Sequence, residues 1–479
     1  MSRLNVNRRK FLAGSATVAA GGLLAAETAL PADVDPDSRQ ASGLKIGEVT
    51  DTTAIVWTRL TKHATRNNSG DVIVGKVNKK SPVKRADDPD QLQAACPGAA
   101  GRIRVRYGLQ DDFAGAKATP WSEVDAKTDF SAQIKLTELE PATKYYVSIE
   151  TVGLDGSTMH APVSAQFETA PRRDDPTDVT FCVTTCLAYS DRDHDDGFNI
   201  FPAMQRLAPK FVVFTGDSVY YDSEEPKAVT PEIARYHWQR MYSLPRHVEL
   251  LRSTATYWEK DDHDTHDNDS WPGYRPMGKF TFDEGTKIYR QQVPIEEPIY
   301  RTYRWGKDLQ IWLTEGRDFR SPNNMPDGPD KTIWGAEQKA WLKRTLLESD
   351  AKWRVLVSPT PIVGPDRKNK HDNHSNIAFQ HEGDEFRHWV KENVAGNFFV
   401  ACGDRHWQYY SVHPETGLQE FACGAASDEH AGGTPGFDER YHKFHRVKGG
   451  FLSIHVADGR ITVRHHDVHG EVVNEWVGT

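Results

Sequence analysis

The segment FVVFTGDSVYYD, residues 211–222, constrains the fold more than any other part of this chain. It opens with an unbroken run of apolar and β-branched residues, which is typical of a strand buried on both faces of a sheet. The run ends at Gly216, and Asp217 follows where open α/β sheets bind ligands, beyond the carboxyl end of a strand. With the phenol of Tyr220 close behind, this carboxylate offers oxygen ligands to a multivalent cation. The alternative is a strand that simply ends in a polar turn.

Strand-like and helix-like patterns alternate from residue 179 to the end of the chain, which predicts an α/β domain with a partly mixed sheet. Further strands are expected at residues 179–186, 254–258, 309–314, 353–358 and 397–402. Helices are expected at residues 199–207, 231–251 with a break at Pro245, and 336–347. The last helix is expected to bury Leu347 and to expose Gln338.

Loops that follow apolar runs carry most of the candidate functional residues. They are Cys186 on the first loop, Asp217 and Tyr220 on the second, Asp261, Asp262, His263 and Asn268 on the third, and Asp404 and His406 on the fourth. Because the strand ends of one sheet converge, these side chains can meet although they are far apart in sequence. Two plainer alternatives stay open: Cys186 is a buried core residue, or residues 261–269 are a solvated acidic loop.

The donors on these loops suit two different kinds of metal ion. A thiolate, a phenolate and an imidazole together suit a trivalent or transition ion, whereas carboxylates alone suit Ca²⁺, Mg²⁺ or Mn²⁺. One carboxylate, Asp217, can bridge two such cations about 3.5–4 Å apart. The chemistry that this set predicts is metal-assisted hydrolysis.

Residues 42–171 show an all-β pattern and are predicted to form a separate N-terminal domain, followed by a catalytic domain over residues 179–479. The two-residue spacing that leads to Tyr145 resembles the corner of a fibronectin type III-like sandwich, where a buried tyrosine braces the turn. A polar insert between Thr61 and Gly101 is expected to be a surface loop. We expect this domain to pack or position its neighbour rather than to carry chemistry.

Residues 1–32 read as an export signal, because Arg8-Arg9-Lys10-Phe11-Leu12 precedes a small, apolar stretch. The paired arginines match the twin-arginine (Tat) pattern; an ordinary secretory signal or a membrane anchor is the alternative. We therefore expect export by the Tat machinery to the periplasm or the outside, with no membrane span in the mature protein. The net charge of -9 and the lack of a basic stripe argue against a stable nucleic-acid partner.

At these motifs the chain resembles the PhoD-type alkaline phosphatases, which are related to the purple acid phosphatases within the metallophosphoesterases. The resemblance rests on the export signal, the β-domain, and the motifs TTC, GDSVYYD, WEKDDHDTHDND and CGDRHW. It implies an α/β metallophosphoesterase-like mixed-sheet sandwich preceded by a small all-β, fibronectin III-like domain. It also implies a secreted, metal-dependent enzyme that hydrolyses small phosphate monoesters, diesters or both through a metal-bound hydroxide. Alternatives are a non-catalytic binding protein on the same fold and a hydrolase of another ester, similar to a phospholipase D.

The resemblance also implies a role for each candidate residue. An iron(III) ion would be held by Cys186, Asp217, Tyr220 and His406. One or two calcium ions would face Asp217, Asp262 and Asp404, and Mn, Mg or Zn are possible substitutes. Asn268 would either complete the calcium side or contact the substrate. His263 would contact phosphate or donate a proton. In the hydrolysis that we expect, Arg317 or Arg320 would offset the charge that develops on the substrate. Two departures from the family pattern, Glu259-Lys260 and Glu315-Gly316, indicate a changed contact or specificity near the site.

Overall fold

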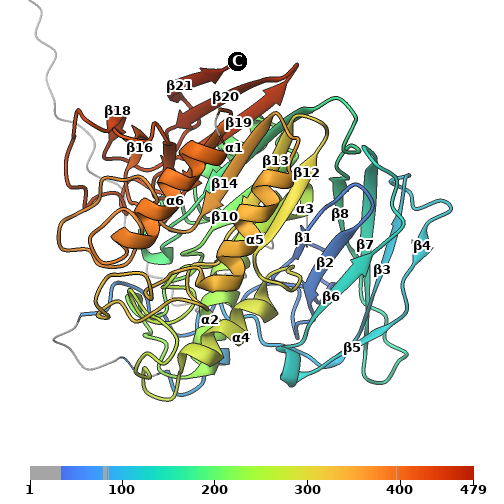
Figure 1. Cartoon of the computed structure of the whole chain (residues 1–479). Coiled ribbons are helices and arrows are strands. Elements are labelled where there is room, and N and C mark those ends of the chain that lie inside the picture. The colour runs from blue at the N-terminus through green and yellow to red at the C-terminus, as the bar shows by residue number, and fades with distance from the viewer. Residues whose placement is uncertain (1–33, 79–83, 85, 395) are drawn as a thin grey trace, which may run out of the picture.

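The computed structural model describes residues 34–78, 84, 86–394 and 396–479. The predicted export signal, residues 1–32, lies outside the described residues. Two large β-sheets pack face to face in the body of the molecule, and a smaller sheet extends it on one side (Figure 1). Among the described residues, no helix combines the length and the apolar character needed to cross a membrane.

The first large sheet has nine strands and carries the segment that opened the sequence analysis. Its parallel centre consists of β9 (Asp178–Thr184), β10 (Phe211–Thr215) and β11 (Ala255–Glu259). On one side it continues antiparallel into β19 (Phe451–Ala457), β20 (Arg460–His466) and β21 (Val472–Gly478). On the other side follow β1 (Leu44–Gly47), β2 (Ala54–Arg59) and β6 (Ser131–Leu136). The predicted strand over residues 211–215 is confirmed residue for residue.

The second large sheet has seven strands and is mixed, as the alternating pattern predicts. Its order is β12 (Arg301–Trp305), β13 (Leu309–Leu313), β14 (Trp353–Ser358), β15 (Phe398–Cys402), β17 (Gln419–Cys423), β16 (Gln408–Val412) and β18 (His442–Arg446). The strands from β13 to β17 run parallel in this order, and the outer pairings are antiparallel. The carboxyl ends of β13, β14 and β15 therefore lie at one edge, as those of β9, β10 and β11 do in the first sheet.

Helices cover the outer faces, so the body is an α/β/β/α sandwich (Figure 1). Along β10, Phe211 and Val213 belong to the core between the sheets, whereas Val212 and Phe214 pack against helices. That outer layer contains α1 (Ile200–Arg206), α2 (Pro231–Tyr242), α3 (Pro245–Ser253) and α4 (Phe282–Gln292). The other outer layer contains α5 (Gly335–Glu348) and α6 (Gln380–Asn393). The fold class implied by the sequence is confirmed.

The helix predictions were correct in position but not always in orientation. The break expected at Pro245 is present, since α2 ends at Tyr242 and α3 begins at Pro245. On α5, however, Gln338 is buried while Leu347 is 57% exposed, which is the reverse of the prediction. Gln338 is buried because its amide binds both the backbone N–H and the carbonyl of Glu315, which the apolar pattern of the helix does not reveal.

The N-terminal strands form a sandwich that shares a sheet with the body. Strands β1, β2 and β6 pack against β3 (Gly101–Gly108), β4 (Lys117–Ala118), β5 (Ser122–Val124), β7 (Lys144–Gly153) and β8 (Val163–Glu168). The predicted tyrosine corner is present, since the Glu140 N–H donates to the Tyr145 hydroxyl over 2.9 Å. Strand β1 also pairs in parallel with β11, with Gly47 opposite Thr256. The sheet is thus continuous across the predicted domain boundary, and the division into two domains at residues 171–179 stays a prediction.

The polar insert after Thr61 is more than a surface loop. Its Cys96 N–H donates to the side chain of Gln239 on α2 over 2.9 Å, and Tyr236 of α2 donates to the Gln93 carbonyl over 2.7 Å. Leu92 and Ala95 of the insert form a small core with Tyr236. The prediction of a surface loop was therefore wrong for this part of the insert, which packs against the body.

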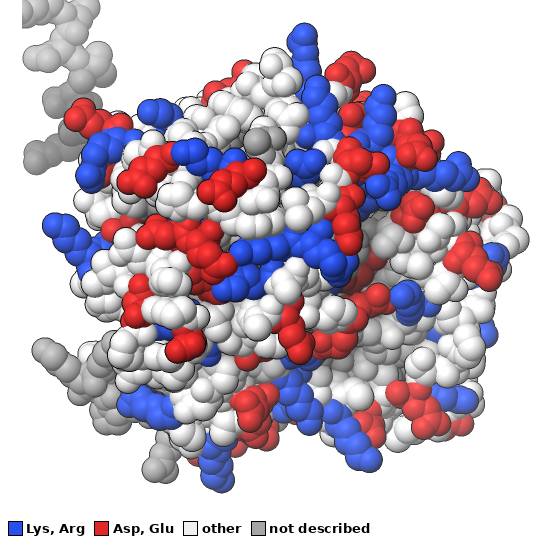
Figure 2. Space-filling model, in the orientation of Figure 1, with Lys and Arg blue, Asp and Glu red and all other residues white. Residues whose placement is uncertain are grey.

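Charged side chains of both signs are interspersed over the face of the molecule seen in Figure 2. No continuous basic stripe crosses this face, and the absence of a nucleic-acid partner stays a prediction.

Candidate metal centre

Candidate residues follow four strands, three in the first sheet and one in the second, at the same distance from the strand end. Cys186, Asp217, Asp261 and Asp404 each lie two residues beyond the last residue of β9, β10, β11 and β15. In Cys186, Asp217 and Asp404 the backbone is left-handed, with φ of 55°, 53° and 59°. Such a conformation costs a non-glycine residue about 1–3 kcal/mol and persists where the surroundings enforce it, often at functional sites. The strand ends therefore fix these side chains at one edge of both sheets.

Glycines beside two of these residues let the strand ends approach closely. At Gly216, whose φ is 88°, an added Cβ would lie 2.6 Å from the Cβ of Asp261. At Gly403, an added Cβ would lie 2.5 Å from the hydroxyl oxygen of Thr215 in the other sheet. Any side chain at either position would separate the strand ends that carry Asp217, Asp261 and Asp404.

One side of Asp217 carries three different donors, and we call Cys186, Tyr220 and His406 the mixed-donor side. Oδ2 of Asp217 accepts hydrogen bonds from the Cys186 thiol over 3.4 Å and from the Tyr220 hydroxyl over 3.2 Å. Ligand atoms of Cys186, Asp217 and His406 all lie within 4.8 Å of one another. The sequence-predicted residues on this side are thus brought together.

Burial makes the mixed-donor side unfavourable for negative charge. It raises the pKa of the Cys186 thiol and of the Tyr220 phenol well above their usual values, and the Asp217 charge adds to both effects. Burial also raises the pKa of Asp217 to about 7. A bound cation reverses this balance by favouring thiolate, phenolate and carboxylate. The donor set therefore fits a metal ion.

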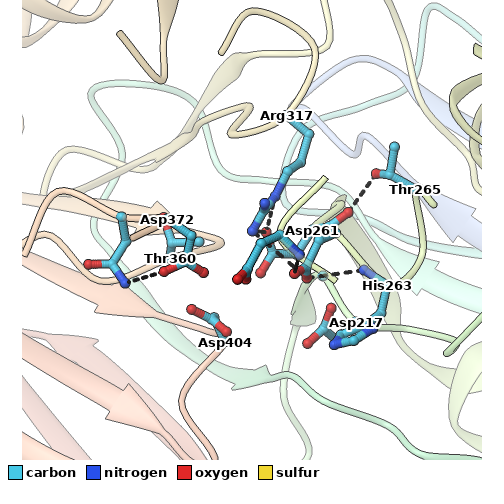
Figure 3. Close-up of polar contacts among 12 residues, drawn as sticks. Asp217, Asp261, His263, Thr265, Arg317, Thr360, Asp372 and Asp404 are labelled. Atoms are coloured by element: carbon cyan, nitrogen blue, oxygen red, sulfur yellow. Dashed lines mark hydrogen bonds and ion pairs between the residues drawn. The ribbon is translucent and has the colours of Figure 1, made fainter. Parts of the chain in front are cut away.

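The other side of Asp217 consists of Asp261 and Asp404, and we call it the carboxylate side. Oxygens of Asp217, Asp261 and Asp404 lie within 4.8 Å of one another, and Figure 3 shows the three carboxylates turned towards a common space. Oδ1 of Asp217 and Oδ2 of Asp261 are buried without a hydrogen-bond partner among the described residues. Buried oxygens of this kind are costly unless they meet a cation, so this side fits one too.

Asp261 is in this group, whereas the resemblance implies Asp262. Asp262 has both oxygens engaged: Oδ1 accepts from the His263 N–H over 3.0 Å and Oδ2 from the Asp269 N–H over 2.6 Å. It still lies within 4.8 Å of Asp217, so its role as a ligand stays a prediction. The signal that could have selected Asp261 is its position two residues beyond the strand, the same as that of Asp217 and Asp404.

His263 is held beside the site by a residue that sequence reasoning missed. Its Nδ1 lies 2.6 Å from Oδ1 of Asp222, and its ring packs on Tyr220 with centroids 4.4 Å apart. Burial opposes protonation of His263, but the charges of Asp222, Asp262 and Asp217 outweigh it and raise the pKa well above its usual value. A protonated imidazole is compatible with the predicted role as a proton donor. The sequence could not show that Asp222 turns back to meet His263.

Arg317 is fully buried and contacts a carboxylate. Its Nε donates to Oδ1 of Asp261 over 2.6 Å, as Figure 3 shows. This hydrogen bond makes Arg317 a positioning residue for Asp261. Direct contact of Arg317 with the substrate stays a prediction. Asn268, the remaining predicted ligand, is exposed, and its backbone N–H donates to Asp267 over 3.1 Å. The contacts in the structure do not place the Asn268 side chain among the donors.

The two departures from the family pattern meet in space. Nζ of Lys260 lies 2.7 Å from Oε1 of Glu315 and 2.6 Å from Oδ1 of Asp318, and both Lys260 and Glu315 are almost fully buried. Burial opposes the charge on Lys260, but Asp318 and Glu315 outweigh it and raise the Lys260 pKa. The departures therefore form one buried ion pair, placed directly before Asp261 in the chain.

A lysine lies among the outermost acidic groups. Asp262, Asp269 and Asp372 approach within 4.8 Å of one another. Nζ of Lys370 lies 2.6 Å from Oδ1 of Asp269 and 3.0 Å from Oδ2 of Asp372. An ammonium group therefore compensates part of this cluster, in contrast to the unpartnered oxygens of Asp217 and Asp261.

His430 and Asp191 are two further residues that sequence reasoning did not place at the site. Nε2 of His430 lies 2.9 Å from the Tyr220 hydroxyl, and Nδ1 lies 2.7 Å from Oδ2 of Asp191. The ring also packs against His406 with centroids 4.2 Å apart. Both residues lie outside the strands, so no strand-end rule selects them.

Comparison with known proteins agrees with this geometry. Residues 181–447, more than half of the chain, match the family model of the PhoD-like phosphatases. The chain belongs to the PhoD-like phosphatase family. Residues 26–171 match the model for the N-terminal domain of these PhoD-like phosphatases. Membership supports a phosphoesterase, and the motifs around Cys186, Asp217 and Asp404 fall inside the larger match.

Solved structures share the fold at low sequence identity. A structure described as that of PhoD is 15% identical, with a TM-score of 0.71 over 94% of this chain and 90% of the other. The purple acid phosphatase PPD1 from yellow lupin (Lupinus luteus) seeds is 12% identical, with a TM-score of 0.62 over 91% of this chain and 73% of the other. None of the curated proteins matches the sequence. These likenesses establish the metallophosphoesterase-like fold.

Proposed function

We propose that this phosphatase is metal-dependent and holds two different metal ions on either side of Asp217. Iron(III) fits the mixed-donor side, because thiolate, phenolate and imidazole donors suit a trivalent or transition ion. Calcium fits the carboxylate side, and Mn, Mg or Zn are possible substitutes there. The observation that carries the proposal is Asp217 itself, whose Oδ2 faces Cys186 and Tyr220 while its buried Oδ1 has no hydrogen-bond partner among the described residues.

The metal ions would activate the attacking water and offset the charge that develops on the phosphate. The protein positions the side chains around the metal ions. Arg317 holds Asp261 in place, and Asp222 holds His263, of which a ring nitrogen lies within 4.8 Å of Asp217 and Asp262. We propose that protonated His263 contacts the phosphate or donates its proton to the leaving oxygen. The substrates would be small phosphate esters, as monoesters, diesters or both.

We further propose that the enzyme acts outside the cytoplasmic membrane, in the periplasm or secreted, after export by the Tat machinery. The support is the paired-arginine segment at Arg8-Arg9. Replacing both arginines by lysine should leave the protein in the cytoplasm, whereas unchanged export of that variant would contradict the Tat route. The measurement is the distribution of protein between cell fractions.

The test of the enzyme proposal is metal analysis combined with hydrolysis of a chromogenic phosphomonoester and a chromogenic phosphodiester. We expect iron together with calcium in the purified native protein, and loss of activity on chelation that is restored by both metals. Asp111→Asn, at an exposed turn position, is the matched control and should behave as the native protein. Protein that is metal-free and inactive even after reconstitution would overturn the proposal. The non-catalytic binding alternative would then become the better explanation.

A further inference from the structure

The phenol of Tyr220 has a support that reaches back to the N-terminal insert. Beyond Tyr220, Nε2 of His430 lies 2.9 Å from the Tyr220 hydroxyl oxygen, and Oδ2 of Asp191 lies 2.7 Å from the other nitrogen of the same ring. Nζ of Lys76, in the insert, lies 2.8 Å from the same oxygen of Asp191. Four side chains thus form a continuous line from residue 76 to a donor of the mixed-donor side.

The geometry fixes the orientation of the His430 ring. A carboxylate only accepts hydrogen bonds, so the ring nitrogen beside Asp191, Nδ1, carries the hydrogen. Nε2 is therefore the nitrogen turned towards Tyr220, and packing on His406 restrains the ring from one face. Carboxylate–histidine pairs of this kind commonly orient groups that bind a metal.

The insert also holds the loop that carries Tyr220. The Val77 N–H donates to the Ser223 carbonyl and the Glu225 N–H donates to the Gly75 carbonyl, each over 2.8 Å. Residues 75–77 therefore pair with residues 223–225, directly after Tyr220 and Asp222. Glu224 adds a second link, because its Oε1 accepts from the Ser190 N–H over 2.6 Å, next to Asp191.

We propose that Lys76, Asp191 and His430 are positioning residues that hold the Tyr220 oxygen for the metal ion of the mixed-donor side. This inference rests on the proposed function, since it assumes that Tyr220 binds a metal. It gives the insert a role in the metal centre, because Lys76 of the insert binds Asp191. His430, which Asp191 binds in turn, contacts the Tyr220 hydroxyl. Removing His430 leaves the Tyr220 hydroxyl in contact with Asp217 and Cys186, both of them residues of the metal centre itself.

The experiment compares iron affinity and the visible tyrosinate-to-iron absorption of variants in the full chain. His430→Phe keeps a ring against His406 but removes both hydrogen bonds. We expect it to weaken iron binding by about 10–100-fold and to shift the absorption band. Asp191→Asn should produce the same kind of shift with a smaller loss of affinity. Lys76→Met should change affinity only a few-fold, because the Lys76 side chain is 65% exposed.

Two control variants separate this support from general structural damage. His388→Phe replaces a half-exposed histidine on α6, and Lys62→Met replaces an exposed lysine of the same insert. Both should match the native protein. An unchanged band and unchanged iron affinity in folded His430→Phe and Asp191→Asn, with iron bound normally by the native protein, would overturn this inference alone. A native protein that binds no iron would overturn the proposed function and this inference together.

Discussion

The two sides of Asp217 obtain their charge balance in different ways. On the carboxylate side, Arg317 pairs with Asp261 and Arg405 contacts Asp404, so guanidinium groups already offset part of the negative charge. On the mixed-donor side, Cys186 and Tyr220 are linked to Asp217 by hydrogen bonds, and burial favours their uncharged forms. Burial nevertheless raises the pKa of Asp261 well above its usual value despite Arg317. A metal ion must therefore help to ionise ligands on both sides, and guanidinium groups assist it on the carboxylate side.

Asp217 belongs to both sides, so its removal should have the largest effect. Asp217→Asn keeps the size of the side chain but cannot carry its charge, and we expect activity to fall by about 10³-fold or more with loss of both metals. Metal content and phosphomonoester hydrolysis, measured beside Asp111→Asn, check this. Retention of both metals by a folded Asp217→Asn protein would show that Asp217 does not join the two sides.

The stability of the protein should depend on the buried ion pair of Lys260 and Glu315, which lies next to the carboxylate side. Lys260→Met leaves Glu315 buried without its cation, and we expect the free energy of unfolding to fall by about 3–5 kcal/mol. The double variant Lys260→Met with Glu315→Gln should recover part of that loss, because the unpaired charge is gone. Denaturant unfolding of the single and double variants measures both effects. A loss below about 1 kcal/mol in Lys260→Met would mean that the pair is not important for folding.

Substitutions of the neighbouring residues Asp261 and Asp262 should distinguish calcium binding on the carboxylate side from iron binding on the mixed-donor side. Oδ2 of Asp261 is buried and has no hydrogen-bond partner in the part of the chain that the structure describes, whereas both oxygens of Asp262 accept backbone hydrogen bonds. We expect Asp261→Asn to weaken calcium binding by about 10–100-fold while iron stays bound. Asp262→Asn should affect calcium less. Calorimetric titration of calcium into iron-loaded protein distinguishes them, and the opposite ranking would assign the calcium side to Asp262.

A histidine remote from both sides provides a pH effect that should not depend on metal. His465 is fully buried between the Tyr409 carbonyl and the Asn474 amide, and burial lowers its pKa to about 3. The unfolded chain, with an ordinary pKa of about 6.5, then binds the proton more readily, so stability is lost as the pH falls below about 6.5.

At pH 5.5 this loss amounts to about 1.3 kcal/mol relative to pH 7, and His465→Gln should not show it. The measurement is the free energy of unfolding against pH for both proteins, with and without metal. Identical slopes for the native protein and His465→Gln would contradict the assignment. A slope difference that disappears on metal loading would show that His465 is coupled to the centre after all.

Sequence reasoning named Cys186, Asp217, Tyr220 and His406, which the structure brings together, whereas on the carboxylate side it chose Asp262 and the structure brings Asp261 close to Asp217 and Asp404. Cys186, Asp217 and Asp404 follow apolar strands at one fixed offset, so a strand-end argument suffices to bring them together. Asp261 has the same offset, but a neighbouring aspartate in an acidic run obscured it. The ion pair of Lys260 and Glu315 joins two loops that each depart from the family pattern. Nothing in the sequence shows that the charge of one residue compensates the charge of the other.

Contacts made by loops were beyond sequence reasoning. Asp222, Asp191 and His430 reach the site through turns whose direction depends on tertiary packing rather than on periodicity. The polar composition of the insert suggested a surface loop, yet residues 75–77 pair with the chain beyond Tyr220. Likewise, nothing in the pattern of β1 shows that it pairs with β11 and makes the N-terminal sandwich continuous with the body.

Anomalous X-ray scattering from crystals of the native protein is the most direct test of whether Asp217 joins two unlike metal sites. Data collected on either side of the iron absorption edge would locate iron independently of other ions. We expect an iron peak among Cys186, Asp217, Tyr220 and His406, and a second, non-iron peak among Asp217, Asp261 and Asp404. Iron absent from the first position, or a single peak that Asp217 does not contact, would contradict this expectation.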